Sequence, residues 1–273
     1  MGYVYLLVSA VLVLLSDGFF EIFRQSYSWW LVPLLLLAFW IGLVLIHVLI
    51  VVIMIFTVDM KKPPKGTKFF RLLIKTGLPI VLKLARVKIE AEGIEKLPQE
   101  GRMLVVCNHQ HDFDPVIIVN SFPDAYLSFI GKKEIYETMP FAARAMHWLE
   151  CLPIDRENDR EAAKTIIKAI KRIKDDEGSI ALFPEGYVSK SCELLPFRNG
   201  SLKIALKSQV PVVVCVINGT RVMAKSLFRR KSTVQFRLLD VINPEDYAGM
   251  NTAELGGIIH EKMQTALDEI RNT

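Results

Sequence analysis

The sequence predicts an α/β domain with a mixed, largely parallel sheet and helices on both faces, preceded by an N-terminal transmembrane helical hairpin. From residue 85 onward, short apolar runs alternate with stretches of helical periodicity. That alternation is typical of a largely parallel or mixed sheet covered by helices. Two long apolar runs lie within residues 3–58, and they predict the hairpin.

Length and composition limit the choices further. The chain has 273 residues, enough for one large domain or a domain with an anchor. Hydrophobic residues make up 51% of it, which is high for a soluble enzyme, and the excess lies near the N-terminus. A formal charge of +5 suits an anionic partner, either a membrane surface or nucleic acid. The 4 cysteines form no C-x-x-C pair, so we expect them to be reduced and mostly buried.

The two apolar runs cover residues 3–16 and residues 29–58, and His47 alone interrupts the second. A helix over the second run reaches roughly 45 Å, more than the roughly 30 Å of bilayer hydrocarbon. The first run is near the lower limit for a span, so one span plus a shallow first segment is the alternative. A cleaved signal peptide is disfavoured because no cation precedes the first run.

The distribution of cations predicts how the anchor is oriented. The loop between the runs carries one cation, Arg24, whereas several follow the second run: Lys61, Lys62, Lys65, Lys68, Arg71 and Lys75. Positive residues concentrate on the cytoplasmic side of membrane spans. We therefore expect residues 1–60 to be a membrane anchor with the rest of the chain on the cytoplasmic face.

Residues 61–84 are expected to form a linker, at residues 63–66, and a basic amphipathic helix. Residues 68–84 alternate cations with apolar side chains, a pattern typical of a helix lying on a membrane surface. The alternative is a helix of the domain core with solvated lysines, and Gly77 and Pro79 would kink either one. No nucleic-acid-binding motif is present, so nucleic acid is not an expected partner.

Residues 85–273 are expected to form the catalytic domain. Apolar alternation or continuous apolar runs predict strands at 87–91, 103–107, 125–130, 151–154, 180–183, 211–217 and 234–238. Helical periodicity predicts helices at 134–148, 157–174, 202–208 and 252–270, with Gly178 closing the second as a C-terminal cap.

Polar side chains crowd the loop after the expected strand 103–107: Asn108, His109, His111, Asp112 and Asp114. Open α/β sheets bind ligands at the carboxyl ends of their strands. His109 and Asp114 have the spacing H-x4-D, and a carboxylate can fix the tautomer of a histidine that acts as a general base. The alternatives are a structural loop histidine and an aspartate that caps a helix starting at Pro115, which is compatible with the catalytic role.

Two other chemistries are disfavoured. A metal site would need more ligands than this loop and the remaining histidines offer, so no metal is expected. Cys107 would point away from Asn108 on a strand, which favours a small buried residue over a nucleophile.

Four ordered segments resemble the motifs of the glycerolipid acyltransferase family, whose best-known members acylate 1-acylglycerol 3-phosphate. They are Asn108-His109 with Asp114, Ile154-Asp155-Arg156, Phe183-Pro184-Glu185-Gly186 and the apolar segment 210–214. Their order and spacing agree across roughly residues 85–220. The resemblance implies acyl transfer from acyl-CoA or acyl carrier protein to the 2-hydroxyl of 1-acylglycerol 3-phosphate, giving phosphatidic acid.

The resemblance also implies roles for particular residues. His109 would take the hydroxyl proton, Asp114 would support it, and no cofactor, metal or covalent enzyme intermediate is implied. Acceptor binding would fall to Asn108, Lys132, Arg156, Phe183, Pro184, Glu185, Gly186 and Arg198. The partners would be membrane lipid, the lysophospholipid acceptor and the thioester donor.

The chain departs from the family after Gly186. The family usually continues Thr-Arg-Ser, whereas this chain has Tyr187-Val188-Ser189. The arginine credited with holding the acceptor phosphate is therefore absent, and Arg156 and Arg198 are the expected replacements, ahead of Lys132 and Lys190. An acyltransferase for another lysophospholipid or an aminoacyl lipid stays open, as does a non-catalytic membrane lipid-binding protein, although the latter would be expected to lack His109 or Asp114.

Overall fold

The computed structural model describes residues 2–20, 31–62 and 68–272. The connecting-loop cation Arg24 and the linker expected at residues 63–66 lie outside these ranges, so the structure gives no account of them.

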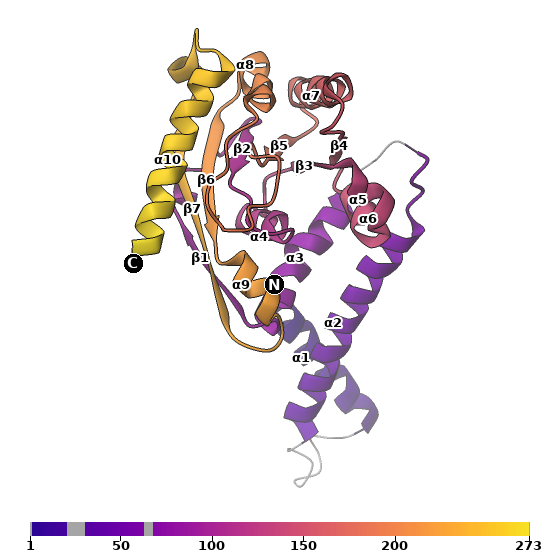
Figure 1. The fold of residues 1–273 in the computed structure, drawn as a ribbon. Coiled ribbons are helices and arrows are strands. Elements are labelled where there is room, and N and C mark those ends of the chain that lie inside the picture. The colour runs from indigo at the N-terminus through magenta and orange to yellow at the C-terminus, as the bar shows by residue number, and fades with distance from the viewer. Residues whose placement is uncertain (1, 21–30, 63–67, 273) are drawn as a thin grey trace.

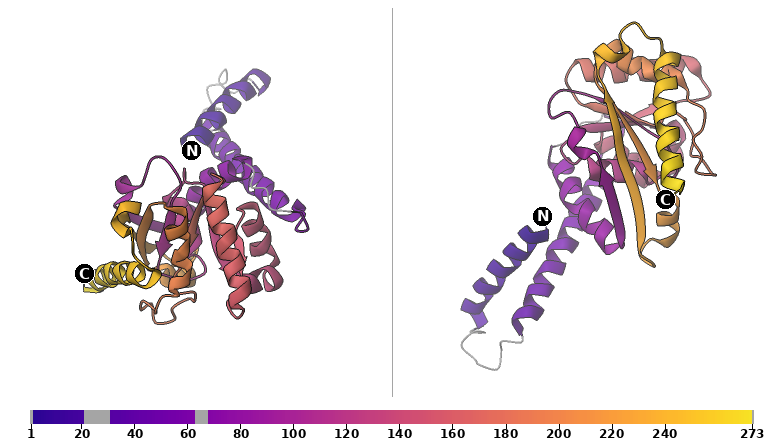
Figure 2. Two further views of the ribbon diagram at one scale, coloured as in Figure 1. Left: turned by 90° about the horizontal axis from the view of Figure 1, so that it is seen from above. Right: turned by 90° about the vertical axis from the view of Figure 1, so that its left-hand side faces the viewer.

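The N-terminal hairpin consists of α1 (Gly2–Phe20) and α2 (Leu31–Thr57), which lie side by side and project from the rest of the molecule (Figures 1 and 2). Of the helices in the described ranges, α2 alone is long and apolar enough to cross a membrane, and α1 contributes a shorter apolar stretch, Val4–Leu15. The expected hairpin is confirmed as a fold element. Whether it spans the membrane once or twice stays a prediction.

Helix α3 (Lys68–Leu84) follows the hairpin and runs through Gly77 and Pro79 as one helix. Its inner side is buried, with Phe70 stacked on Trp148 at 5.4 Å. Its outer side exposes both cations and apolar residues, among them Phe69 and Leu72. The helix was expected to be either a surface helix or a core helix. In the structure its outer side fits the first description and its inner side the second.

Arg71 does not belong to the outward basic side of α3. Its guanidinium lies 3.5 Å from the ring centroid of Tyr126 and donates to the carbonyl oxygens of Leu127 and Leu149 at 2.8 and 3.1 Å. Arg71 is one of the cations that follow the second apolar run, and its side chain is partly buried against the domain. Its Nη2 also lies 3.5 Å from Glu150 Oε2, so both Nη atoms have partners on the domain.

The sheet has 7 strands in the order β1-β7-β6-β2-β5-β3-β4. Every neighbouring pair is parallel except β6 and β7, which confirms the mixed, largely parallel sheet. The strands are β1 (Val87–Glu92), β2 (Leu104–Cys107), β3 (Leu127–Lys132), β4 (Leu152–Ile154), β5 (Ser179–Leu182), β6 (Val212–Asn218) and β7 (Ser232–Ile242).

Helices cover both faces of this sheet, as predicted (Figure 1). Alternate residues of β2 point to opposite faces: Leu104 and Val106 join one core, Val105 and Cys107 the other. The first core is covered by α7 (Asp159–Lys174), α8 (Lys203–Ser208) and α10 (Thr252–Asn272). The second is covered by α3, α4 (Asp114–Ser121), α6 (Pro140–Trp148) and α9 (Thr220–Ser226).

The hairpin joins the domain on the second of these faces. Trp148 Nε1 of α6 donates to the carbonyl oxygen of Met54 in α2 at 2.8 Å. His47 Nε2 lies 2.9 Å from the carbonyl oxygen of Leu73 in α3. Gly77 makes this approach possible, because a Cβ there would lie 2.4 Å from His47 Nε2.

Three expected elements need correction. The helix at 134–148 is two helices, α5 (Lys133–Thr138) and α6, because Pro140 lacks an N–H and starts a new helix. The strand expected at 125–130 is shifted to Leu127–Lys132. The cap of α7 is not Gly178: the helix ends at Lys174, and Asp176 takes the left-handed conformation with φ 56°. Gly178 instead allows close packing, since a Cβ there would lie 2.9 Å from Tyr126 O.

Helix α9 and three short 3-10 helices were not predicted. The 3-10 helices are η2 (Ile94–Lys96), η3 (Asn199–Leu202) and η4 (Pro244–Tyr247). Segments this short give too few residues for a periodic pattern. The cysteines match expectation: Cys107, Cys151 and Cys215 are buried and Cys192 is partly exposed, all as free thiols.

Candidate active site

The polar loop after β2 folds around the carboxylate of Asp114. Asp114 Oδ2 lies 2.7 Å from His109 Nδ1 and accepts from the backbone N–H groups of Gln110 and His111 at 2.6 and 2.9 Å. Asp114 is fully buried at the start of α4, where Pro115 supports the first turn. The carboxylate therefore holds the Nδ1 proton of His109 and leaves Nε2 able to accept one.

Aromatic stacking fixes the plane of the His109 ring. The ring of Phe183, just after β5, lies 4.1 Å from it at an interplanar angle of 12°. Phe129 of β3 stacks in turn on Phe183 at 6.3 Å. Neighbouring strands β2, β5 and β3 supply these rings, so the sheet order sets the orientation of His109.

Glu185 braces this loop. Its side chain is buried, and its two carboxylate oxygens accept from the backbone N–H groups of His109 at 2.6 Å and Leu195 at 2.8 Å. Burial raises the pKa of Glu185 to about 7, and the two backbone hydrogen bonds act against that rise. The expected contact of Glu185 with acceptor hydroxyls stays a prediction; in the structure each of its two oxygens binds one main-chain donor.

Asn108 is likewise engaged by the main chain. Its Nδ2 donates to the carbonyl oxygen of Ile217 at 3.0 Å, and its Oδ1 accepts from the N–H of Ile217 at 2.7 Å. The side chain is buried and joins the ends of β2 and β6. The structure thus gives Asn108 a structural role, and its expected contact with substrate stays a prediction.

Arg221 of α9 binds the same loop and was not among the expected site residues. It donates to the carbonyl oxygens of Gln110 at 3.2 Å and Ser189 at 2.8 Å, and Ser189 N donates to His109 O at 2.8 Å. A cation three residues after the buried strand β6 was the one available signal.

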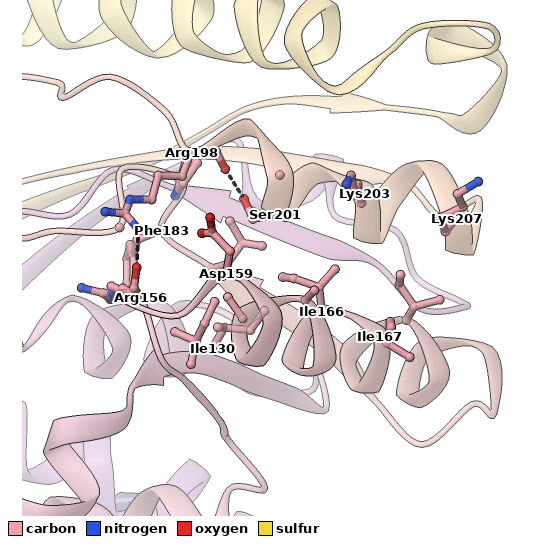
Figure 3. Close-up of a pocket in the computed structure, with 18 residues that line it drawn as sticks. Ile130, Arg156, Asp159, Ile166, Ile167, Phe183, Arg198, Ser201, Lys203 and Lys207 are labelled. Carbon is pink, nitrogen blue, oxygen red and sulfur yellow. Dashed lines mark hydrogen bonds between the residues drawn. The ribbon is translucent and has the colours of Figure 1, made fainter.

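A groove of about 850 Å³ opens beside this site, between α7 and α8 (Figure 3). Its walls are largely apolar, with Ile166, Ile167 and Ile170 from α7. Phe183, Pro184 and Gly186 line it too, so the ring stacked on His109 also bounds the groove. Lys203 and Lys207 lie along the α8 side (Figure 3).

Two arginines stand at one end of this groove, and both lie near the ring of Tyr187. The guanidinium carbons of Arg156 and Arg198 lie 5.4 and 5.0 Å from the Tyr187 ring centroid. Arg198 Nη2 also donates to Tyr187 Oη at 2.9 Å, and Nη1 donates to Arg156 O at 3.2 Å. Burial lowers the pKa of Arg156 from its usual value, and the charge of Arg198 adds to the effect.

Lys132 is not part of this arrangement. It lies outside the groove lining and pairs with Glu134, Nζ to Oε1, at 3.2 Å. The structure thus brings Arg156 and Arg198 together with Phe183, Pro184 and Gly186, but leaves Lys132 apart.

His111 is stacked on Phe113, with ring centroids 5.4 Å apart. Within the described ranges, no group of three or more His, Cys, Asp or Glu side chains could hold a metal ion.

Comparison with known proteins also points to acyl transfer. The family model described as Acyltransferase matches residues 88–218, the part of the chain that carries the sheet and the His109 loop. Fold and family model therefore define an enzyme of the O-acyltransferase class. Within that class, the match is in line with the glycerolipid acyltransferase family that the motifs of this chain resemble.

Relatives of known name cover most of the chain. The 1-acyl-sn-glycerol-3-phosphate acyltransferase of Haemophilus influenzae is 28% identical over 185 residues, 67% of this chain and 76% of its own. That of Borreliella burgdorferi is 27% identical over 205 residues, 73% of this chain and 80% of its own. The crystal structure of the 1-acyl-sn-glycerophosphate acyltransferase PlsC from Thermotoga maritima covers 100% of this chain and 99% of its own, with a TM-score of 0.59 at 20% identity, which shows a shared fold.

Proposed function

We propose that the protein transfers a fatty acyl group from an acyl thioester to the 2-hydroxyl of 1-acylglycerol 3-phosphate, making phosphatidic acid. The observation that carries the proposal is the buried His109–Asp114 pair beside an apolar groove with two arginines at one end. The names of the relatives support the same acceptor.

His109 is the general base of this reaction. Its Nε2 takes the proton from the acceptor hydroxyl as the oxygen attacks the thioester carbonyl, and Asp114 stabilises the imidazolium that forms. Collapse of the tetrahedral intermediate breaks the carbon–sulfur bond, and the imidazolium returns its proton to the leaving thiolate. The ester and the free thiol are the products, so no covalent enzyme intermediate is needed.

Arg156 and Arg198 hold the acceptor phosphate in this proposal. The phosphate carries up to two negative charges, and an arginine can present a planar pair of donors to its oxygens. Both guanidinium groups already lie within 5.4 Å of the Tyr187 ring centroid at the groove end, so little reorganisation is needed. Lys132 is the next candidate, because it lies at the end of β3 with its side chain partly exposed.

The groove between α7 and α8 holds a fatty acyl chain. Its isoleucine-rich wall removes methylene groups from water, and each buried methylene stabilises the complex by about 0.8 kcal/mol. The groove reaches Phe183, which is stacked on His109, so a chain lying in it ends next to the base.

The reaction takes place at a membrane surface. Residues 1–60 are the anchor, residues 61–84 the interfacial segment and residues 85–273 the catalytic domain, which faces the cytoplasm. The apolar hairpin and the exposed apolar and basic side of α3 support this placement.

A panel assay of the purified full-length chain tests the proposal. The acceptors are 1-acylglycerol 3-phosphate, lysophosphatidylethanolamine and an aminoacyl lysolipid, each offered with acyl-CoA and with acyl carrier protein. We expect the highest kcat/KM with 1-acylglycerol 3-phosphate. Absence of transfer to every acceptor with both donors would refute an acyltransferase, and the donor pair decides between CoA and carrier protein.

A second acceptor has one observation in its favour. Tyr187 stands where the family usually has threonine, and its hydroxyl accepts from Arg198 Nη2. An acceptor without a terminal phosphate could use the Tyr187 hydroxyl and leave the arginines paired with the ring. Preference for lysophosphatidylethanolamine in the same panel would select this alternative.

A further inference from the structure

The turn between α9 and β7 has a composition that differs from the rest of the domain. The sequence contains no aspartate or glutamate between Glu193 and Asp240, whereas residues 220–231 carry 5 cations. Four of these are exposed, and no ion pair with them occurs among the residues the structure describes: Lys225, Arg229, Arg230 and Lys231. The segment is therefore an uncompensated positive surface.

Two large apolar side chains stand out of the same segment. Val222 is 65% exposed and Phe228 is 62% exposed. Phe228 also has a left-handed backbone conformation, with φ 62°, in a turn closed by bonds from Arg229 and Arg230 N–H to Ser226 O. A largely exposed phenyl ring on a residue with a left-handed backbone contributes little to the stability of the fold. Such a residue is typical of a surface that binds a partner or a membrane.

This turn adjoins α3. Ser232 N, at the end of the turn, donates to the carbonyl oxygen of Arg86 at 3.1 Å, and Val87 of β1 is in register with Ser232. The outer side of α3 and the residues after it expose a further mixture of cations and apolar groups: Lys68, Phe69, Leu72, Lys75, Val81, Lys83, Leu84 and Arg86. The turn and α3 thus form one surface with the same chemistry.

The same surface is continuous with the apolar hairpin. Met223 of α9 and Leu82 of α3 pack in one core, on the face of the sheet where α2 joins the domain. Figures 1 and 2 show the turn after α9 on the side of the domain from which the hairpin projects. Cations and aromatic residues next to an apolar anchor suit a bilayer that contains anionic lipid.

We propose that residues 222–231 form a second membrane-contact surface, in which Phe228 enters the interface and Arg229, Arg230 and Lys231 bind anionic lipid headgroups. It rests on the proposed membrane attachment and not on the proposed reaction. Helix α9 is linked to the His109 loop, because Gly219 N donates to Gln110 Oε1 and Arg221 Nη2 donates to Gln110 O. Binding of residues 222–231 to lipid therefore also orients the His109 loop toward the membrane.

Photo-crosslinking of the full-length chain in vesicles tests the proposal. The photoreactive amino acid p-benzoylphenylalanine replaces Phe228, or Lys174 on the opposite face of the sheet, or Leu37 in the hairpin. The vesicles are phosphatidylcholine alone or phosphatidylcholine with phosphatidylglycerol. We expect lipid adducts from position 228 in the anionic vesicles, from position 37 in both, and none from position 174.

A charge-matched pair of variants separates a specific contact from general attraction. Arg229→Gln/Arg230→Gln/Lys231→Gln should lower adduct formation at position 228 by roughly fivefold or more, following the usual contribution of a cation near an anionic membrane. Lys168→Gln/Lys171→Gln/Lys174→Gln, three exposed cations of α7, should leave it unchanged.

Each other outcome counts against the proposal in a distinct way. Adducts from position 37 without adducts from position 228 would mean that the hairpin binds and the turn does not. No lipid adduct at any position would overturn the membrane attachment as well, while acyl transfer, which this test does not use, would stand. Adducts of position 228 with added acyl carrier protein in place of lipid would assign the surface to that protein.

Discussion

The carboxylate of Glu185 accepts a 2.6 Å hydrogen bond from the backbone N–H of His109. Its other oxygen accepts from Leu195 N–H at 2.8 Å, so one buried side chain joins the histidine loop to the segment that leads to Arg198. The position of the proposed base and the path of the chain toward the proposed phosphate site therefore depend on the same carboxylate.

Loss of the base should abolish turnover while the fold survives. We expect His109→Ala to lose all measurable acyl transfer and Asp114→Asn to lose roughly 10² to 10⁴-fold in kcat, the usual range for acid–base groups. Circular dichroism of each variant in detergent controls for folding. Near-normal rates from folded His109→Ala protein would exclude this mechanism.

The raised pKa of Glu185 predicts a pH-dependent stability. A glutamate in the unfolded chain has its usual pKa of 4.5 and is ionised above that pH, whereas folded Glu185 keeps its proton until about pH 7. Its contribution to the free energy of unfolding is therefore fully present below pH 4.5 and is lost as the pH rises to 7, by about 3 kcal/mol.

Thermal unfolding in detergent measures this effect as the difference in Tm between the wild type and Glu185→Gln. Glu185→Gln cannot ionise, so the Tm of the wild type should fall relative to that of the variant between pH 4.5 and 7. The variant should also lower kcat by roughly tenfold, because the NH2 group of an amide accepts no hydrogen bond and leaves one of the two backbone N–H groups unpaired. Parallel Tm curves for the two proteins would show that Glu185 titrates normally.

The arginines flanking Tyr187 should control the use of the acceptor. We expect Arg156→Ala and Arg198→Ala each to lower kcat/KM for 1-acylglycerol 3-phosphate by roughly 10 to 150-fold, the equivalent of about 1.5 to 3 kcal/mol for a charge-assisted pair. The apparent affinity for the thioester donor should change much less. Lys190→Ala, which removes an exposed cation nearby, is the matched control.

Steady-state kinetics with acceptor varied at fixed donor concentration measure these effects. If both arginine variants keep the wild-type acceptor kinetics, the phosphate is held elsewhere, and Lys132→Ala is the next variant to examine. An equal loss for acceptor and donor would instead indicate damage to the groove.

Filling the groove should change the preferred acyl length. Ala163 of α7 lines it, and Ala163→Phe should lower activity with long-chain donors more than with medium-chain donors. The expected loss is roughly fourfold per methylene that no longer fits, from about 0.8 kcal/mol each. Lys171→Phe places the same side chain on α7 outside the lining and should keep the wild-type preference. Unchanged selectivity in Ala163→Phe would place the acyl chain elsewhere.

The sequence by itself determined what depends on nearby residues. Apolar alternation placed β1, and continuous apolar runs placed β2, β5 and β6, within a residue or two, because the burial of a strand determines which of its own side chains are apolar. Residues 68–84 were predicted as a helix with the bounds that the structure gives. The contact between His109 and Asp114 was also accessible, since a single turn closes it.

The tertiary structure decided what depends on distant partners. Glu185 binds the N–H of His109 across 76 positions, Asn108 binds Ile217 across 109, and Arg71 reaches Leu127 across 56. Asn108 and Glu185 were expected to bind substrate, because residue type and motif alone favour that role. The fold brings main-chain groups of distant segments to each of these side chains. A buried donor or acceptor left unpaired costs about 1 to 3 kcal/mol, so these contacts with the main chain prevail.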